Sequence, residues 1–202
     1  MASFEPSFLV RSHGLTSIRR APRAGRVAAQ RGETVESGMV LRPMSFDAEP
    51  ARAHDLEQAL ELLRREDLPE KGVVEHFGHF HVVRDDGRVV GLSGLEVHGP
   101  DGLLRSVAVE TAYRGQGLAA SLVEASLGLA RRVGLRSVYL LTTTASGYFR
   151  RRGFADCPRE EAPEGIRESW EFRVGCPTTS VLMKKTVDAA KRTVDPALPP
   201  GR

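Results

Sequence analysis

The sequence has few of the residues that mark several large classes of protein. Its 202 residues include only two cysteines, Cys157 and Cys176, and one tryptophan. No apolar run approaches the roughly 18 residues that a membrane-spanning helix needs, so we expect no membrane partner. Two cysteines without CxxC spacing argue against a disulfide-dense scaffold and favour a reducing compartment, with the cytoplasm as the expected location. An apolar fraction of 41% is enough for the core of one ordinary domain with tails.

The excess of basic residues is confined to the two ends of the chain. The whole sequence has a formal charge of +3 and a pI of about 9.1. Residues 1–38 carry +3 and residues 184–202 carry another +3, which leaves −3 for residues 39–183. A mildly acidic central part has no electrostatic footprint for a phosphate backbone, so we expect no nucleic-acid partner.

Both ends also lack the periodicity of folded segments. Residues 1–38 are rich in Arg, Ala and Ser without a sustained apolar pattern, which predicts a disordered or spurious extension. An Arg-rich, acid-poor leader also fits an organellar transit peptide, whereas the apolar region of a secretory signal is lacking. We expect residues 39–185 to form the single folded domain and residues 186–202 to form a disordered, proline-containing tail.

The central part begins with strand and helix patterns. Residues 40–43 form a candidate first strand, and residues 55–65 place apolar residues at helical spacing. Residues 79–83 and 88–97 are predicted strands, joined by an Asp-Gly turn at Asp86 and Gly87 that is a strong hairpin signal. Residues 103–109 form a third strand, which completes an antiparallel meander.

A helix and a further strand are predicted next. From residue 115 onward the apolar period becomes helical. Its main row consists of Leu118, Leu122, Ala125 and Leu129. Gly134 is a C-cap residue, and the apolar run over residues 137–141 is typical of an interior strand. A strand, a helix and a strand in this order form a parallel pair. Residues 145–152 predict a short helix that ends at Gly153, with strands near residue 154 and over residues 180–184.

The segment Arg114-Gly115-Gln116-Gly117-Leu118-Ala119 lies between a predicted strand end and a predicted helix start. Glycines have no Cβ and let a ligand approach the backbone closely. Helix N-termini offer unpaired N–H groups and a partial positive charge, and Arg114 adds a full charge, so the segment predicts a diphosphate site. The sequence has neither a GxxxxGK[ST] loop nor a GxGxxG loop opening an early strand-helix-strand unit, which disfavours ATP and NAD.

This segment follows the strand Ser106-Val107-Ala108-Val109 and resembles the Gln/Arg-x-x-Gly-x-Gly/Ala signature of the GNAT superfamily of acyl-CoA transferases. The resemblance covers residues 40–185 and includes the pattern Phe149-x-x-x-Gly153-Phe154. It implies an α/β GNAT fold, with a mixed central sheet, an antiparallel meander, a splayed parallel pair and flanking helices. It also implies acetyl-CoA as the cosubstrate, with the splay at Val107, Ala108 and Val109 freeing backbone groups that pair with pantetheine.

Three side chains are candidates for the chemistry of acetyl transfer. Glu96 is either the base that deprotonates the acceptor amine or a surface glutamate. The family often has a tyrosine as general acid where this chain has Phe149, and the adjacent Tyr148 points about 100° away on a helix, so only a local irregularity would bring it to that place. Thr144 stands where the family often has Asn. Its hydroxyl either contacts pantetheine or substrate, or caps the next helix.

Two arginines and one cysteine are candidate substrate contacts. Arg105 and Arg167 have the geometry to bind an oxyanion bidentately, although at least one is expected on the surface. A narrower resemblance to N-acetyltransferases associated with arsenic resistance rests on residues 94–97, 103–109, 139–144 and the Cys176-Pro177 pair. It draws attention to Cys176 because trivalent arsenic prefers thiolates. The alternative is a small buried hydrophobic residue.

These patterns together predict an N-acetyltransferase that moves the acetyl group of acetyl-CoA to a primary amine of a small molecule, with an arsenical or phosphinic amino acid as a candidate. A non-catalytic acyl-CoA-binding regulatory module is the rival, because the usual tyrosine is missing, and a protein acetyltransferase is a third interpretation. No metal is expected, since His76, His79 and His81 have no acidic or thiol ligand nearby in sequence. The oligomeric state is open, with a homodimer among the options.

Overall fold

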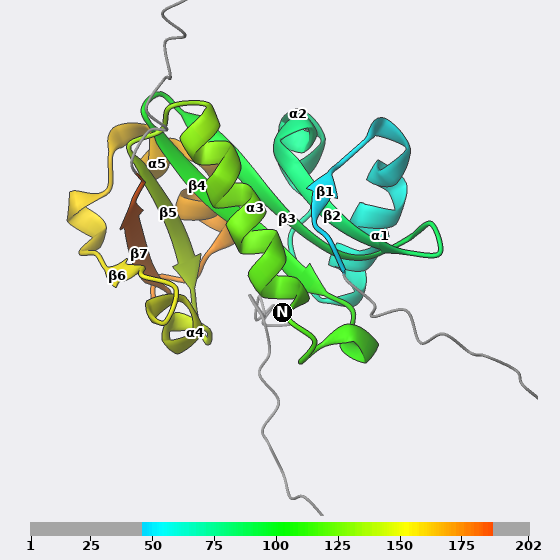
Figure 1. The fold of residues 1–202 in the computed structure, drawn as a ribbon. Coiled ribbons are helices and arrows are strands. Elements are labelled where there is room, and N and C mark those ends of the chain that lie inside the picture. The colour runs from blue at the N-terminus through cyan, green and yellow to red at the C-terminus, as the bar shows by residue number, and fades with distance from the viewer. Residues whose placement is uncertain (1–45, 188–202) are drawn as a thin grey trace, which may run out of the picture.

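The computed structural model describes residues 46–187, so the candidate strand at residues 40–43 lies outside the described part. Within that part a seven-stranded mixed sheet has the order β1-β2-β3-β4-β5-β7-β6, with helices on both faces (Figure 1). The strands are β1 (Glu49–Pro50), β2 (Phe80–Asp85), β3 (Arg88–His98), β4 (Asp101–Val109), β5 (Ser137–Thr142), β6 (Ala155–Asp156) and β7 (Val181–Thr186). The helices are α1 (Leu56–Arg65), α2 (Val73–His76), α3 (Leu118–Arg132), α4 (Ser146–Arg150) and α5 (Glu164–Glu168), with a π-helical turn η5 (Glu171–Gly175). None of the helices within residues 46–187 is long and apolar enough to cross a bilayer.

The predicted meander is confirmed. β2, β3 and β4 pair as antiparallel neighbours. Asp86 and Gly87 form the two-residue turn between β2 and β3, and both have positive φ, at 46° and 78°. A right-handed strand twist favours this kind of turn, which needs residues that tolerate the left-handed region. The turn therefore sets the pairing of Asp85 with Arg88 at the end of the β2–β3 hairpin, and a register shift follows between Val83 and Arg84.

The sheet is covered on both faces, which explains why its central strands are almost wholly apolar. Val82 and Val83 are consecutive on β2, so their side chains point to opposite faces. Val82 packs in a cluster with residues of α1, whereas Val83 packs with Leu118 and Leu122 of α3. Burial on both faces removes the polar alternation that a half-exposed sheet would show.

Helix α3 confirms the predicted helix, but its buried stripe differs from the expected row. Leu118 and Leu122 are buried as expected, whereas Ala125 and Leu129 are only partly buried. The stripe also includes Val123 and Ala130, which lie beside the expected row, and Ser126 and Leu127, which were not expected. Ser126 belongs to it because its Oγ lies 2.8 Å from Ser93 Oγ on β3, so a hydrogen bond satisfies a polar residue in an apolar face.

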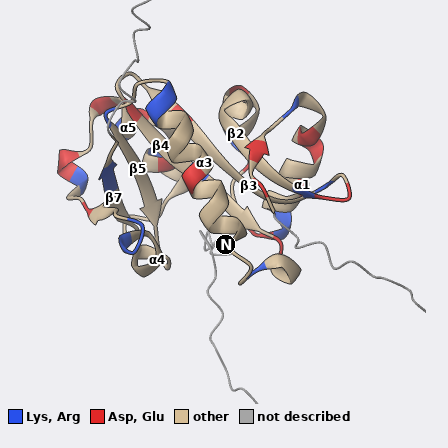
Figure 2. Cartoon of the chain, in the orientation of Figure 1, with Lys and Arg blue, Asp and Glu red and all other residues tan. Residues whose placement is uncertain are grey.

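The last turn of α3 and the segments after it follow the sequence pattern. Figure 2 shows basic residues at the C-terminal end of α3, where Arg131 and Arg132 complement the helix dipole. Gly134 and Gly153 have φ of 77° and 80°, and each ends a helix as predicted. The chain then returns through β7, which pairs with β5 and leaves β6 at the sheet edge.

Candidate active site

Strands β4 and β5 are paired over only the first part of their length. Asp101, Gly102 and Leu103 on β4 are the residues with partners on β5. Beyond Leu103 the two strands diverge, as Figure 1 shows. The splay therefore begins after Leu103, closer to the start of β4 than the predicted position at Val107 to Val109.

A β-bulge in β4 lies beside this opening. Arg105 pairs with Gly94 and Ala108 pairs with Leu92, so Ser106 and Val107 together oppose the single residue Ser93 of β3. Ser106 has a φ of 53°. A non-glycine residue in this region costs about 1–3 kcal/mol and is concentrated at functional sites. The bulge leaves one extra residue of β4 without a partner in the hydrogen-bond ladder, at the edge of the splay.

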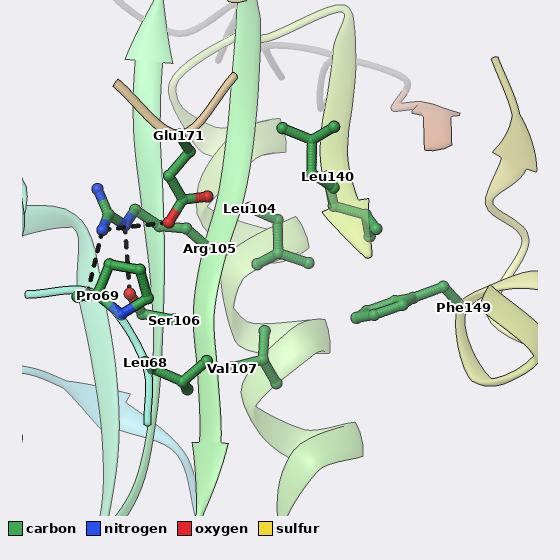
Figure 3. Close-up of a pocket in the computed structure, with 10 residues that line it drawn as sticks. Leu68, Pro69, Leu104, Arg105, Ser106, Val107, Leu140, Phe149 and Glu171 are labelled. Atoms are coloured by element: carbon green, nitrogen blue, oxygen red, sulfur yellow. Dashed lines mark hydrogen bonds and ion pairs between the residues drawn. The ribbon is translucent and has the colours of Figure 1, made fainter. Parts of the chain in front are cut away.

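The splay contains an open cleft, with about 400 Å³ of empty space when the solvent at its mouth is included. Figure 3 shows Leu104 and Val107 on one side of β4 with Leu140 and Phe149 across from them, and Arg105 on the other side of the strand. The residues that line the cleft are Leu68, Pro69, Leu104, Arg105, Ser106, Val107, Leu140, Leu141, Phe149 and Glu171. The cleft therefore joins an apolar half to a charged half through the gap between the strands.

The charged half is a buried cluster around Arg105. The side chain of Arg105 is 0% exposed, and its guanidinium contacts Glu96 and lies 3.1 Å from Oε1 of Glu171. Its Nε donates to Ser106 Oγ at 3.2 Å. Glu96 is held from a second side by Nε2 of His98, at 3.1 Å. One guanidinium thus faces two buried carboxylates, which leaves the cluster with excess negative charge if both are ionised.

The two carboxylates have opposite pKa shifts. Burial raises the pKa of Glu171 to about 7, and the charge of Glu96 adds to the shift while Arg105 opposes it. Burial also acts to raise the pKa of Glu96, but the hydrogen bond with His98 and the charge of Arg105 outweigh it and hold that pKa below its usual value. The more basic carboxylate is the one that lines the cleft.

The loop before α3 has the geometry that the sequence predicted. Gly115 and Gly117 have φ of 79° and 90°, and Gly117 is the N-cap of α3. The carbonyl of Gly117 accepts from the N–H groups of Ala120 and Ser121. The first N–H groups of the helix have no intrahelical acceptor and are directed at the exposed loop. This arrangement suits an anion at the end of β4, next to the open splay.

Arg114 is part of this loop but is already engaged within the fold. Its Nε donates to the carbonyl of Val109 at 3.0 Å, and its Nη2 is paired with Glu66. The side chain is 30% exposed. Gln116 is exposed, and its Nε2 donates to the carbonyl of Ala112 at 3.3 Å. Arg114 therefore anchors the loop to β4, while the glycines and the helix N-terminus provide its open surface.

The bulge and the cleft lie along the C-terminal half of β4, and the glycine loop and the start of α3 follow the end of that strand. This order fits a long coenzyme with a diphosphate and an extended arm. Residues 42–154 match the acetyltransferase (GNAT) family. The chain belongs to this family. It is therefore an acyltransferase with acetyl-CoA as its cosubstrate, and the GNAT fold expected from the sequence is confirmed.

The sequence similarity to two acetyltransferases covers only part of each protein. An uncharacterized N-acetyltransferase of Chlorobaculum tepidum is 29% identical over 108 residues, which are 53% of this chain and 67% of the relative. An amino-acid acetyltransferase of Azotobacter vinelandii is 31% identical over 134 residues, 61% of this chain and 31% of the relative. The chain thus spans about a third of the amino-acid acetyltransferase named here.

Solved structures agree with the fold. The N-acetylglutamate synthase of Neisseria gonorrhoeae, complexed with coenzyme A and N-acetyl-glutamate, has a TM-score of 0.64 and 19% identity, over 72% of this chain and 36% of that one. A Mycobacterium tuberculosis protein in complex with CoA and NLQ has a TM-score of 0.59 and 23% identity, over 69% of this chain and 98% of that one. At these identities the likeness supports the GNAT fold alone.

The structure separates Tyr148 from the cleft of the GNAT domain. Phe149 lines the cleft, whereas Tyr148 packs edge-on against Phe149, with ring centroids 5.1 Å apart. The guanidinium of Arg152 lies 3.5 Å from the centroid of the Tyr148 ring. Burial raises the pKa of Tyr148, and the neighbouring Arg152 opposes that shift. The local irregularity that would bring Tyr148 into the cleft is not found in α4, so its suggested role as general acid lacks geometric support.

The candidate substrate residues also lie in different places. Arg105 lines the cleft, whereas Arg167 is exposed on α5. Cys176 is 7% exposed in an apolar cluster, and burial raises the pKa of its thiol to about 12, which agrees with the alternative of a small buried hydrophobic residue. Thr144 is exposed just after β5. Thr142 Oγ1 accepts from the N–H of Ala145, the residue before the first turn of α4, at 2.9 Å.

Glu171 was not among the site residues predicted from the sequence. The residue stands between two aromatic residues in Trp170-Glu171-Phe172, and this is the one local signal that a carboxylate there is buried. Its partner Arg105 is far away in sequence, so spacing alone does not connect the two. Glu96 was predicted to be either the base or a surface glutamate. It is buried and paired with Arg105, and it is not among the residues that line the cleft.

Proposed function

We propose that this GNAT protein transfers the acetyl group of acetyl-CoA to a primary amine of a small molecule. The observation that carries the proposal is the cleft in the splay, where apolar walls at Leu104, Val107 and Leu140 meet the carboxylate of Glu171. Apolar walls suit an acetyl group, and a carboxylate suits the ammonium form of an amine. When bound, acetyl-CoA supplies the activated acyl carbon, and the protein supplies orientation and a proton route.

The residues present fit the coenzyme. The N-terminus of α3 with Gly115 and Gly117 would hold the diphosphate, and the bulge at Ser106 and Val107 leaves backbone groups at the edge of the splay. The α3 N-terminus and this bulge flank the C-terminal half of β4. An arm that runs along this half of the strand would reach the cleft from the diphosphate site.

The names of the relatives favour an amino acid as the acceptor, since several are amino-acid acetyltransferases. The finer proposal of an arsenical or phosphinic amino acid rests on the narrower sequence resemblance. Cys176 gives it little support, because a buried thiol with a raised pKa is a poor ligand for arsenic. Two free cysteines in the described residues are compatible with the cytoplasm, which we retain as the proposed location.

The test is an acceptor screen with the purified chain and acetyl-CoA. Ordinary amino acids, amines without a carboxylate, phosphinic and arsenical amino acids and lysine-containing peptides are incubated separately, and acetylated product and free CoA are measured by mass spectrometry. Equal amounts of CoA and acetylated small molecule, above a no-enzyme control, are the expected result. Saturable CoA binding without product from any acceptor would favour the regulatory module, and product from peptides alone would favour a protein acetyltransferase.

A further inference from the structure

We propose that Glu171 is the catalytic residue that takes a proton from the ammonium group of the acceptor, with Arg105 and Glu96 as positioning residues. This inference rests on the proposed function and adds to it the proton acceptor and the form in which the acceptor binds. It differs from the sequence-based expectation, in which Glu96 held this role.

Position in the cleft separates the two buried carboxylates. Glu171 lines the cleft together with Ser106 and Val107 of the β4 bulge, whereas Glu96 does not line it. Both are 4% exposed, so neither is a freely solvated surface acid. A general base needs contact with the proton that it removes, directly or through one water. Glu171 lies at the cleft and can meet this requirement, whereas Glu96 is paired with Arg105 and is not among the residues that line the cleft.

The surroundings of Glu171 orient it and make it basic. Arg105 on β4 holds one of its oxygens at 3.1 Å, Glu96 on β3 adds negative charge, and Cys176 follows η5 as a buried thiol. Glu96 in turn faces His98, with His76 of α2 adding a more distant charge effect. Burial raises the pKa of Glu171 to about 7, so that the carboxylate can both accept and release a proton near neutral pH.

Charge balance in the cluster also favours a cationic acceptor. The guanidinium of Arg105 already faces two carboxylates, so it has less capacity for a carboxylate on the substrate than an unpaired arginine would have. An ammonium group that enters beside Glu171 compensates the excess negative charge of the cluster. The site is therefore expected to bind the acceptor as its protonated amine.

The proton and bond changes balance as follows. The ammonium nitrogen gives one proton to the Glu171 carboxylate and becomes a neutral amine. That amine forms a C–N bond with the acetyl carbon while the C–S bond breaks, and the second nitrogen proton goes to the departing sulfur, giving free CoA with its thiol protonated. Glu171 then releases its proton to solvent, and an acetamide remains.

The test compares Glu171→Gln with two matched variants in the full chain. Gln keeps the shape of the side chain but does not accept the proton. Glu168→Gln changes an exposed glutamate on the neighbouring α5, and Glu96→Gln changes the other carboxylate of the same buried cluster. We expect Glu171→Gln to lower kcat/KM by about 10²-fold or more and to remove the rise in rate near pH 7. We expect Glu168→Gln to match the wild type. We expect Glu96→Gln to keep a rise in rate but at lower pH, because the charge of Glu96 adds to the raised pKa of Glu171.

Binding of acetyl-CoA, measured by calorimetry, shows whether each variant is folded, and its affinity should stay close to that of the wild type. If Glu171→Gln does not bind, Glu171→Asp is used instead, and its pH profile should be displaced from that of the wild type. A Glu171 variant that binds and keeps the wild-type rate and profile would overturn the assignment, as would loss of the rise in Glu96→Gln alone. A wild-type chain that acetylates no amine would instead refute the proposed function.

Discussion

The guanidinium of Arg105 lies 3.1 Å from the carboxylate of Glu171 and also contacts Glu96, although all three side chains are buried. Each charge is tolerable only because the others are present, since an isolated buried ion carries a large desolvation penalty. The cluster also joins β3, β4 and η5, so the position of η5 over the cleft depends on it. Gly72 packs closely here, because a Cβ at this residue would lie 2.8 Å from Nη1 of Arg105.

Arg105→Met should be strongly destabilising because it leaves Glu96 and Glu171 buried without a partner. We expect a loss of about 3–5 kcal/mol in the free energy of unfolding, measured by urea denaturation at pH 7.5. Adding Glu96→Gln and Glu171→Gln to the same protein should restore more than half of that loss, since the unpaired charges are gone. If the free energy of unfolding of Arg105→Met alone lies within about 1 kcal/mol of the wild-type value, as is usual for an exposed ion pair, the cluster is solvated.

Gly117→Ala should weaken acetyl-CoA binding and lower stability. Gly117 has a φ of 90° at the N-cap of α3, and a Cβ there is disfavoured by about 1–2 kcal/mol. The matched control is Gly128→Ala within α3, where the added methyl meets only the end of the Arg132 side chain. That substitution should stabilise the protein by up to about 1 kcal/mol and leave binding unchanged. Calorimetry and urea denaturation measure both effects, and equal behaviour of the two variants would contradict the role of the loop.

Much of the fold could be predicted because its signals are local. The Asp86-Gly87 turn, the glycines that end α3 and α4 and the switch from strand to helix period all lie within short windows of sequence. The loop at Arg114 to Ala119 is of the same kind, since its glycines and the helix start are adjacent. Such features identify the family without any knowledge of distant contacts.

The rest of the site depends on contacts that sequence spacing does not contain. The splay depends on how far β5 follows β4, and the pairing ends at Leu103 and Tyr139, which no local motif marks. Glu171 lies in a π-helical turn, and its partner Arg105 is on a strand in the middle of the sheet. Ala125 and Leu129 were expected in the buried stripe of α3, but Ser126 and Leu127 are buried there instead.

Thiol labelling should distinguish the two cysteines. Cys176 is buried, and burial raises its pKa to about 12, whereas Cys157 is partly exposed beside β6. Because the thiolate is the reactive form, Ellman's reagent at pH 8 should modify Cys157 in the folded protein and Cys176 only after unfolding in guanidinium. Cys157→Ser should then remove the fast reaction, and Cys176→Ser should retain it. A fast reaction at Cys176 would restore it as a candidate arsenic ligand.

His81 should make the stability of the protein depend on pH. The side chain on β2 is 4% exposed, and its Nδ1 has no hydrogen-bond partner within residues 46–187. Burial, with a contribution from Arg132, lowers the pKa of His81 from 6.5 to about 4. The unfolded chain therefore binds a proton between pH 6.5 and pH 4 that the folded protein does not, so stability falls as the pH drops through this range.

With these two pKa values, the contribution of His81 to the free energy of unfolding should fall by about 2 kcal/mol as the pH drops from 7 to 5. In His81→Leu the side chain does not titrate and fills a similar buried volume. The free energy of unfolding of this variant should therefore fall by about 2 kcal/mol less than that of the wild type over the same pH interval. Urea denaturation of both proteins at the two pH values measures the difference, so that the contributions of all other groups cancel. Parallel curves for the two proteins would mean that folding does not lower the pKa of His81.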